Sequence, residues 1–487
     1  MSAIVPEAGV EAKKPSVVGL IEKDASAHKA GAVRRPSYFT RALSTLVYRG
    51  RVIISTTRKR QTRRKAHSAT QLIELAEALL SRRGDASGVG LARRLLDAYA
   101  SANATSRVSF LRSLANHFGP DLDRVRKAAE GFIAGGTAES AQSLHAAAEP
   151  RRQELIRRLN LASEGTLALI RMREELLANM TNHRELRAVD ADMHHLFAAW
   201  FNRGFLSVRT IDWKTPAHIL EKLIKYEAVH QIQDWNDLRR RTEPADRRCF
   251  AFFHPCLPDE PLIFVEVALT REIPGAIGPL LAADRESVSA SQANTAVFYS
   301  ISNCQKGLKG ISFGHFLIKQ VAEELRKELP SVRRFVTLSP IPGFSSWLEK
   351  ERANTASTVF PASDRDALTA LSAADWYANR KHREDLKEPL VRAAAHYFLV
   401  TKGKDGRPVD PVAKFHLGNG ARLERLNVYG DMSLKGIKQS MGMMVNYLYE
   451  LQDVERNHEE FANTGRIVAS MAVRRILGRD GSRSGVQ

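Results

Sequence analysis

The segment from Val297 to Trp347 decides the fold, because strand-like, glycine-rich and helical patterns follow one another in it. The run Val297-Phe-Tyr-Ser-Ile-Ser302 predicts a strand, and Gln305-Lys-Gly-Leu-Lys-Gly-Ile-Ser-Phe-Gly314 predicts a basic turn. A helix is expected over His315–Glu328, and Ser339-Pro-Ile-Pro-Gly-Phe344 follows it. Free backbone N–H groups and the positive end of a helix dipole meet at such a turn, which predicts a site for a phosphate or pyrophosphate.

Length and composition limit the class of protein. The 487 residues exceed the usual size of one core, so two domains are expected. No apolar run approaches the ~18 residues of a membrane span and no signal-peptide pattern opens the chain, which indicates a soluble protein without a membrane partner. Cys249, Cys256 and Cys304 lack metal-type spacing and are typical of a reducing compartment. Cys304 is expected to be a buried thiol rather than a nucleophile.

The positive charge is concentrated near the N-terminus. The net charge is +19, yet no Asp or Glu occurs between Ala25 and Ile73, where Lys and Arg are frequent. Residues 1–68 are therefore expected to form a basic, loosely attached arm. A binder of nucleic acid or of a membrane surface that works through this arm stays an alternative. The rest of the chain carries no zinc-finger, RNP or helix-turn-helix signature, so no nucleic-acid partner is expected.

Helical periodicity begins after the arm. Leu72, Leu75, Ala76, Leu79 and Leu80 recur at the spacing of one helix face. Similar amphipathic runs are Leu91–Ala104, Val108–Phe118, Leu122–Ile133, Leu155–Leu161, Leu167–Met180 and Leu186–Phe201. They predict an all-α helical bundle over residues 69–200 that serves assembly or support. The adjacent His194 and His195 are expected to be a surface or interface pair rather than a metal site.

A mixed α+β pattern follows over residues 201–480, with a short tail at 481–487. Strands are expected at Cys249–His254, Leu262–Leu269, Val297–Ser302 and Arg334–Leu338, and a helix at Leu390–Val400. The connections are too long for a meander, and a helix follows the glycine-rich turn. The pattern therefore predicts a sheet with helices packed on it.

Ordered motifs in this second half resemble the malonyl-CoA decarboxylase family. They are His254-Pro-Cys256, Pro261-Leu-Ile-Phe-Val-Glu-Val-Ala-Leu-Thr270, Phe298-Tyr-Ser-Ile-Ser302, Gly307-Leu-Lys-Gly310, Leu338-Ser-Pro-Ile-Pro-Gly-Phe344 and Phe415-His-Leu-Gly-Asn-Gly-Ala421. The resemblance implies a multidomain protein in which a helical bundle precedes a GNAT-like, acyl-CoA-binding catalytic domain. It implies conversion of malonyl-CoA to acetyl-CoA and CO2 without metal, biotin or another cofactor. A homodimer or homotetramer is implied as well.

The resemblance also assigns site residues. The CoA-binding loop of the family corresponds to Lys309, Gly310, Ile311, Ser312, Phe313, Gly314 and His315. The catalytic serine and histidine correspond to Ser339 and His416, and an active-site tyrosine corresponds to Tyr449, with Tyr447 two positions away. Without the family, Ser339 reads as a turn residue and His416 as a structural histidine on an alternating, strand-like run.

The chemistry explains why these residue types serve decarboxylation. Loss of CO2 from a malonyl thioester leaves an enolate-like carbanion, whose charge backbone N–H groups at a distorted strand can stabilise. A histidine with an ordinary pKa of about 6.5 is expected to protonate the carbon as a general acid. Ser339 is expected to orient the leaving carboxylate and to fix the imidazole.

One departure from the family pattern concerns the substrate. The family carries a glutamate at the position of Ser312 and a small polar residue at the position of His315. A methylmalonyl-CoA or another malonyl-like substrate therefore stays an alternative, as does a GNAT-type acyltransferase with a second, acceptor-binding site. The chain ends Gly485-Val-Gln487 without a Ser-Lys-Leu peroxisomal address, and a bacterial cytoplasm is expected.

Overall fold

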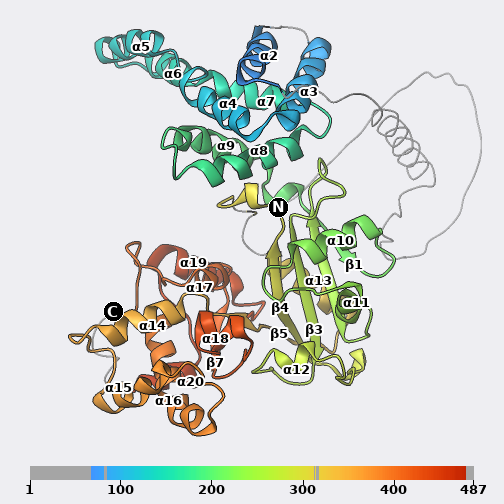
Figure 1. The fold of residues 1–487 in the computed structure, drawn as a ribbon, viewed down its shortest axis with the longest axis vertical. Helices are drawn as coiled ribbons and strands as arrows, with labels where there is room; N and C mark the ends of the chain where they lie inside the picture. The colour runs from blue at the N-terminus through green and yellow to red at the C-terminus, as the bar shows by residue number, and fades with distance from the viewer. Residues whose placement is uncertain (1–66, 82–84, 312, 314–316, 479–487) are drawn as a thin grey trace, which may run out of the picture. The chain divides into compact units, whose positions relative to one another are not determined.

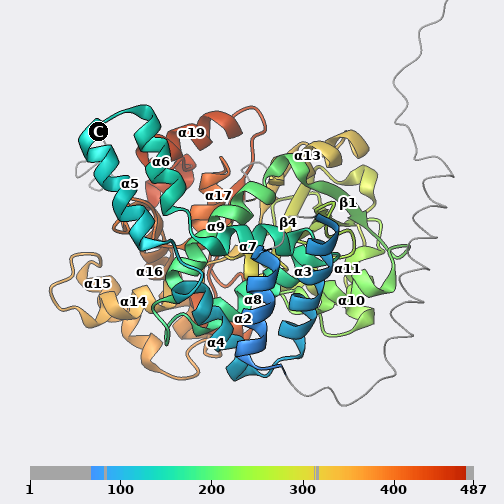
Figure 2. The ribbon, with the colours of Figure 1, turned by 90° about the horizontal axis from the view of Figure 1, so that it is seen from above.

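Helices make up the first part of the chain in the computed structural model, which describes residues 67–81, 85–311, 313 and 317–478 (Figure 1). The predicted arm lies almost entirely outside these residues. Eight α-helices precede the first strand within the described ranges, and Figure 2 shows them from a second side. They are α2 (Ala69–Ser81), α3 (Asp85–Ser101), α4 (Ala104–Asn116), α5 (Leu122–Gly135), α6 (Ala138–Ala148), α7 (Arg151–Asn160), α8 (Gly165–Asn179) and α9 (Leu186–Trp200).

Local signals explain where these helices begin and end. The Asp121 carboxylate accepts hydrogen bonds from two backbone N–H groups in the first turn of α5, and Thr137 forms a capping box with Ser140 at α6. The predicted apolar face is confirmed in α2, where Leu72, Ala76 and Leu79 are fully buried. The sequence patterns did not predict α6, whose only buried residue is Ala147.

A mixed sheet follows the helical region. Its strands are β1 (Ser207–Ile211), β2 (Arg247–Phe253), β3 (Ile263–Thr270), β4 (Thr295–Asn303), β5 (Arg334–Thr337), β6 (Ser339–Pro340), β7 (Arg422–Asn427) and β8 (Met444–Leu448). The order is β1-β2-β3-β4-β5-β8-β6, and β7 pairs with β8. The four predicted strands are confirmed as β2 to β5. A helical region followed by an α+β sheet domain confirms this part of the expected fold class.

The strands β4 and β5 give the sheet its distinctive feature. They run parallel from Thr295↔Arg334 to Phe298↔Thr337 and are joined through α13 (Leu317–Glu328). The register against β3 skips Tyr299, because Val267 faces Phe298 while Glu266 faces Ser300. This β-bulge lies next to Phe298, the last residue of β4 that pairs with β5. Beyond the bulge, β4 continues to Asn303 without its parallel neighbour.

Helices cover both faces of the sheet. On one face, α10 (Ala217–Tyr226) packs Leu220 and Leu223 in one cluster with Phe264 of β3. On the other face, Val321 and Leu325 of α13 share the main core with Val265. The alternation of Phe264 and Val265 along β3 places them on opposite faces. Two further helices, α11 (Trp235–Thr242) and α12 (Gly278–Leu281), precede β2 and β4 in the chain.

The C-terminal helices are interleaved with β7 and β8. They are α14 (Phe344–Ala353), α15 (Ala362–Leu368), α16 (Arg380–Leu399), α17 (Pro411–Gly418), α18 (Leu434–Ser440), α19 (Val454–Thr464) and α20 (Met471–Ile476). The strand-like interpretation of the run around His416 is wrong, because this residue lies in α17. An Asp410 cap and Pro411 at the first helical position start that helix. Among the described residues, no helix has the length and apolarity of a membrane span.

Candidate active site

Ser339 lies where the chain leaves β5. It forms the two-residue strand β6 with Pro340 and pairs with Val445 of β8. The downstream motif bends sharply at Gly343, where a Cβ atom would lie 2.5 Å from the Tyr397 hydroxyl oxygen. A larger residue at this position would therefore displace the Tyr397 hydroxyl. Ser339 is only 5% exposed.

The helix α17 brings His416 to Ser339. The Asp410 Oδ1 atom caps this helix by accepting hydrogen bonds from the N–H groups of Val412 and Ala413, both at 2.9 Å. After the helix, Gly420 has a φ of +81°, and a Cβ atom there would lie 2.0 Å from the Val454 carbonyl oxygen. The Asn-Gly sequence thus lets the chain turn back tightly after His416, which is 3% exposed.

Five residues form what we term the His416 cluster: Thr337, Ser339, His416, Tyr447 and Tyr449. The Ser339 Oγ and His416 Nε2 atoms are 3.1 Å apart, and the Tyr449 hydroxyl is 2.8 Å from Nδ1. Ser339 donates its single hydroxyl hydrogen to Thr337 Oγ1 at 2.9 Å. We assign the Nε2–H tautomer from this network, since Nε2 then donates to Ser339 and Nδ1 accepts from Tyr449.

The two tyrosines have different positions around the imidazole. Tyr449 makes the hydrogen bond to Nδ1, and its own N–H group donates to the Phe335 carbonyl at 2.8 Å. Tyr447 stacks on the ring of His416, with centroids 4.6 Å apart and planes at 26°. The Tyr447 hydroxyl is buried and has no hydrogen-bond partner within the described ranges. Burial raises the pKa of both phenols well above the usual value, so both are protonated.

Burial also sets the charge of the imidazole. Desolvation lowers the pKa of His416 from 6.5 to about 3, so the ring is neutral near pH 7. The assumption of an ordinary histidine pKa is therefore wrong for this site. Desolvation acts in the opposite sense on the capping residue, because it raises the pKa of Asp410 to about 6.

The predicted CoA-binding residues follow β4. The chain forms a 3₁₀ turn, η3 (Lys306–Leu308), and passes through Gly310, which has a φ of +83°. Lys309 and Gly310 are exposed, whereas the side chains of Ile311 and Phe313 are buried in the main core. Ser312, Gly314 and His315 lie outside the described residues. We call the described residues 304–311 the β4–α13 loop.

A cavity of about 540 Å³ lies beside this loop. That volume is within the range of small-molecule sites. Its lining includes Lys306, Lys309 and Gly310 from the loop and Glu174, Leu177 and Ala178 from α8. The lining therefore contains two cations, one carboxylate and part of the helical region, for which the sequence predicted only a role in assembly or support.

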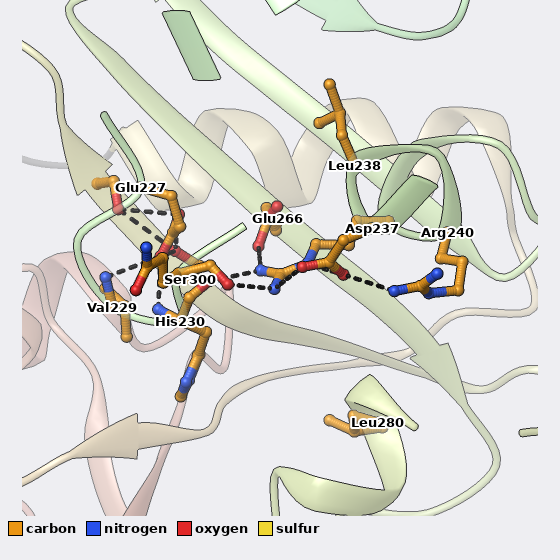
Figure 3. A network of polar contacts seen from close by, with 12 residues as sticks. Glu227, Val229, His230, Asp237, Leu238, Arg240, Glu266, Leu280 and Ser300 are labelled. Carbon is orange, nitrogen blue, oxygen red and sulfur yellow. Dashed lines mark hydrogen bonds and ion pairs between the residues drawn. The ribbon is translucent and has the colours of Figure 1, made fainter. Parts of the chain in front are cut away.

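A second buried polar group was not predicted from the sequence. We call it the Arg241 network: Glu227, His230, Asp237, Arg241, Glu266 and Ser300. Figure 3 shows the network, with Glu227, His230, Asp237, Glu266 and Ser300 among the labelled residues. The Arg241 guanidinium donates to both Asp237 oxygens at 3.1 and 3.0 Å and to Glu266 Oε2 at 3.2 Å. Glu227 accepts from the Ser300 hydroxyl at 2.8 Å and from two backbone N–H groups. These contacts tie the segment between α10 and α11 to β4 at its bulge.

Cys304 is a buried thiol at the start of the β4–α13 loop. Burial raises the pKa of the Cys304 thiol well above its usual value, in agreement with a buried rather than a nucleophilic residue. Within the described ranges, no three His, Cys, Asp or Glu side chains come together as metal ligands would.

Known proteins resemble the chain over most of its length. Residues 118–201 match the model of the malonyl-CoA decarboxylase N-terminal domain, and residues 204–486 match that of the C-terminal domain. The mitochondrial malonyl-CoA decarboxylase of Anser anser anser is 35% identical over 399 residues, which cover 75% of this chain and 79% of the relative.

Solved structures extend this similarity. The crystal structure of malonyl-CoA decarboxylase from Rhodopseudomonas palustris is 58% identical, with a TM-score of 0.82, and the match covers 84% of this chain and all of that one. The enzyme from Agrobacterium vitis is 53% identical, with a TM-score of 0.80 and the same coverage of both chains. The range of this chain that the C-terminal model matches includes the positions of Ser339, His416 and Tyr449. This chain therefore belongs to the malonyl-CoA decarboxylase family.

Proposed function

We propose that the chain decarboxylates malonyl-CoA to acetyl-CoA and CO2, with His416 and Ser339 at the reacting end of the substrate. Family membership supports the reaction, since the named relatives are malonyl-CoA decarboxylases. The observation that carries the site assignment is the 3.1 Å contact between Ser339 and His416, which are 77 residues apart in the sequence.

Strand direction supports one binding site for both ends of the substrate. Because β4 and β5 are parallel, the β4–α13 loop and Ser339 both follow the carboxyl ends of neighbouring strands. Ligands of sheets with parallel strands bind at that edge. Five residues of β4 beyond Phe298, at about 3.3 Å each, separate the two regions by roughly 17 Å along the strand. A thioester carried on the long pantetheine arm suits this separation.

The reaction consumes one proton in each turnover. The C–C bond to the carboxylate breaks, CO2 leaves, and the electron pair stays on the α-carbon as an enolate conjugated with the thioester carbonyl. Protonation of that carbon gives acetyl-CoA. We assign this proton to His416 Nε2, which is directed toward Ser339 in the assigned tautomer.

The low pKa of His416 makes substrate binding part of the proton transfer. The imidazole is neutral in the empty site because it is desolvated. A malonyl carboxylate that enters beside it brings a negative charge into a low-dielectric environment and raises the pKa of the imidazole. The ring then takes up a proton, which it delivers after CO2 has left.

The other residues of the His416 cluster position this group. Tyr449 fixes the ring through Nδ1. When the malonyl carboxylate binds, the Ser339 hydroxyl exchanges its hydrogen bond to Thr337 Oγ1 for one to the carboxylate. Developing charge on the thioester oxygen requires donors that are already in place. The bulge at Tyr299 lies where β4 and β5 stop pairing, which makes the backbone of this part of β4 our candidate for the donors.

Product analysis tests the reaction and the acyl preference together. Purified protein incubated with malonyl-CoA is expected to form equal amounts of acetyl-CoA and CO2. Methylmalonyl-CoA is compared in parallel, because Ser312 departs from the family pattern. Acyl transfer to an acceptor without release of CO2 would instead support an acyltransferase and contradict the proposal.

We also propose a homodimer or homotetramer assembled through the helical region, in a bacterial cytoplasm. The exposed apolar side chains of α5 support the assembly, since Leu122 is 70% and Ile133 is 82% exposed. The free thiols of the three cysteines and the bacterial sources of the solved relatives support the compartment. Light scattering of the purified protein measures the subunit count, and a monomer would contradict the assembly.

A further inference from the structure

The β4–α13 loop is attached to the helical region by a buried arginine. Arg173 of α8 is 1% exposed, and its Nη1 atom donates to the carbonyl oxygens of Gly307 at 2.7 Å and Lys309 at 3.0 Å. Its Nε atom donates to Asp190 of α9 at 2.8 Å, which fixes the guanidinium from the other side. A charged donor shared between two carbonyls of one turn restrains the conformation of that turn.

Two further contacts bring the loop close to the helices. A Cβ atom on Gly307 would lie 1.9 Å from the carbonyl oxygen of Ile170, so only glycine allows this approach. The Nε2 atom of His194 lies 3.2 Å from the carbonyl oxygen of Gly310. The predicted surface or interface histidine pair thus includes one member that contacts the loop. The carbonyl groups of Gly307, Lys309 and Gly310 all face the helical region.

The orientation of these carbonyls determines where the next N–H groups point. In a planar trans peptide the C=O bond and the following N–H bond point in opposite directions. The N–H groups of Leu308 and Ile311 donate to the carbonyls of Gln305 and Leu308, at 2.9 and 3.0 Å. The N–H group of Gly310 has no acceptor in the part of the chain that the structure describes. Because the Lys309 carbonyl faces Arg173, this N–H group points away from α8.

We propose that Arg173 is a positioning residue for the nucleotide end of the substrate: from the helical region, it holds the β4–α13 loop in the conformation that binds the phosphates of CoA. The proposal rests on the proposed function. It makes the helical region part of the substrate site, in agreement with the cavity lining that α8 shares with Lys306 and Lys309. Arg173 acts through the loop and does not contact the reacting atoms.

Two substrates separate this role from general support of the fold. Malonyl-CoA carries the phosphates, whereas malonyl-pantetheine has the same thioester without the nucleotide. In Arg173→Met, which puts an unbranched apolar side chain where the guanidinium lies over the Phe197 ring, we expect KM for malonyl-CoA to rise about tenfold to a hundredfold, as for a lost charge-assisted hydrogen bond. The kcat for malonyl-CoA and the kcat/KM for malonyl-pantetheine should stay within about twofold of the wild type. Equal losses of kcat/KM with both substrates, or an unchanged KM for malonyl-CoA, would overturn the proposal.

His194 and His195 provide a matched pair if Arg173→Met fails to fold. Both side chains are exposed, but only His194 contacts the loop. His194→Ala is expected to raise KM for malonyl-CoA about threefold to tenfold, as for one ordinary hydrogen bond, while His195→Ala leaves it unchanged. Equal KM values for malonyl-CoA in His194→Ala and His195→Ala would overturn the proposal.

Binding of free coenzyme A separates this proposal from the proposed reaction. Calorimetry of Arg173→Met should show a Kd for coenzyme A that is about tenfold to a hundredfold higher than in the wild type, and an unchanged Kd for pantetheine. If the wild type binds coenzyme A but releases no CO2, the proposed function fails while the binding role is still tested. If CO2 release is normal and the Kd for coenzyme A is equal in the two proteins, the role of Arg173 is refuted.

Discussion

The His416 cluster and the Arg241 network are both buried polar groups of the same sheet domain, yet they handle charge differently. In the Arg241 network, the Arg241 guanidinium is paired with the Asp237 carboxylate, and it also donates to the backbone carbonyls of His230 and Gln231. In the His416 cluster, a hydroxyl and a phenol surround the imidazole, and the ring is neutral. No described acidic side chain forms an ion pair with it.

This difference indicates what each group does. A buried charge with its partners in place holds chain segments in a defined arrangement, and removal of one partner leaves the other uncompensated. A buried neutral acid or base without a counter-charge can respond to a charge that the substrate brings. The comparison therefore assigns structure to the Arg241 network and reactivity to the His416 cluster.

The largest expected effect is the loss of turnover in His416→Ala and Ser339→Ala. Each substitution should lower kcat for malonyl-CoA by on the order of a hundredfold or more, because it removes the proton donor or the residue that orients it. Steady-state assays of acetyl-CoA formation measure this, with His195→Ala as the control. Near-wild-type rates in both variants would contradict the site assignment.

The next effect is on stability. Arg241→Met removes the cation that compensates Asp237 and that donates a hydrogen bond to Glu266, so we expect the free energy of unfolding to fall by about 3–5 kcal/mol. The kcat of the folded fraction should be unchanged within about threefold. Denaturant unfolding and assays of the same preparation provide both values. A large loss of kcat at normal stability would mean that the network takes part in the reaction.

Phe variants of the two tyrosines should differ from each other in kcat by a smaller factor. Tyr449→Phe removes the hydrogen bond to His416 Nδ1, so kcat should fall about fivefold to tenfold, as for one neutral hydrogen bond. Tyr447→Phe keeps the stacked ring and removes a hydroxyl that has no partner among the described residues, so kcat should stay within about twofold. The reverse order would exchange the roles of the two residues.

The smallest effect is the pH dependence of stability, which should have opposite signs in the two groups. The pKa of His416 falls from 6.5 to about 3 on folding. Its contribution to the free energy of unfolding is therefore complete above pH 6.5 and is lost as the pH falls toward 3. Desolvation raises the pKa of Glu266 from 4.5 to about 8, so its contribution is present below pH 4.5 and is lost as the pH rises toward 8.

Glutamine variants test these two signs in denaturant unfolding. His416→Gln should reduce the acid-side loss of stability between pH 6.5 and 3. Glu266→Gln keeps the shape of the side chain and should remove the loss between pH 4.5 and 8. Identical pH profiles in each variant and the wild type would show that burial does not shift these two pKa values as described.

The sequence predicted the fold better than the site. Alternating and continuous apolar runs located β2 to β5, because strands in a buried sheet consist mainly of such residues. The same criterion failed at His416, where Phe415 and Leu417 suggested alternation. Asp410 and Pro411 carry the helix-start signal that should have been preferred.

The site residues came from family resemblance, since no spacing rule joins Ser339 to a histidine 77 positions later. The contacts of Arg173 and His194 span 134 and 116 residues and arise only when the helices pack on the loop. The lowered pKa of His416 is likewise a property of its burial, which no local pattern contains.

A complex with an unreactive malonyl-CoA analogue tests the central claim most directly. The account predicts that the carboxylate of the analogue lies within hydrogen-bond distance, about 2.6–3.2 Å, of Ser339 Oγ or His416 Nε2, with the nucleotide phosphates on the β4–α13 loop. A structure in which the loop holds the phosphates while the acyl end lies out of contact with both Ser339 and His416 would contradict it.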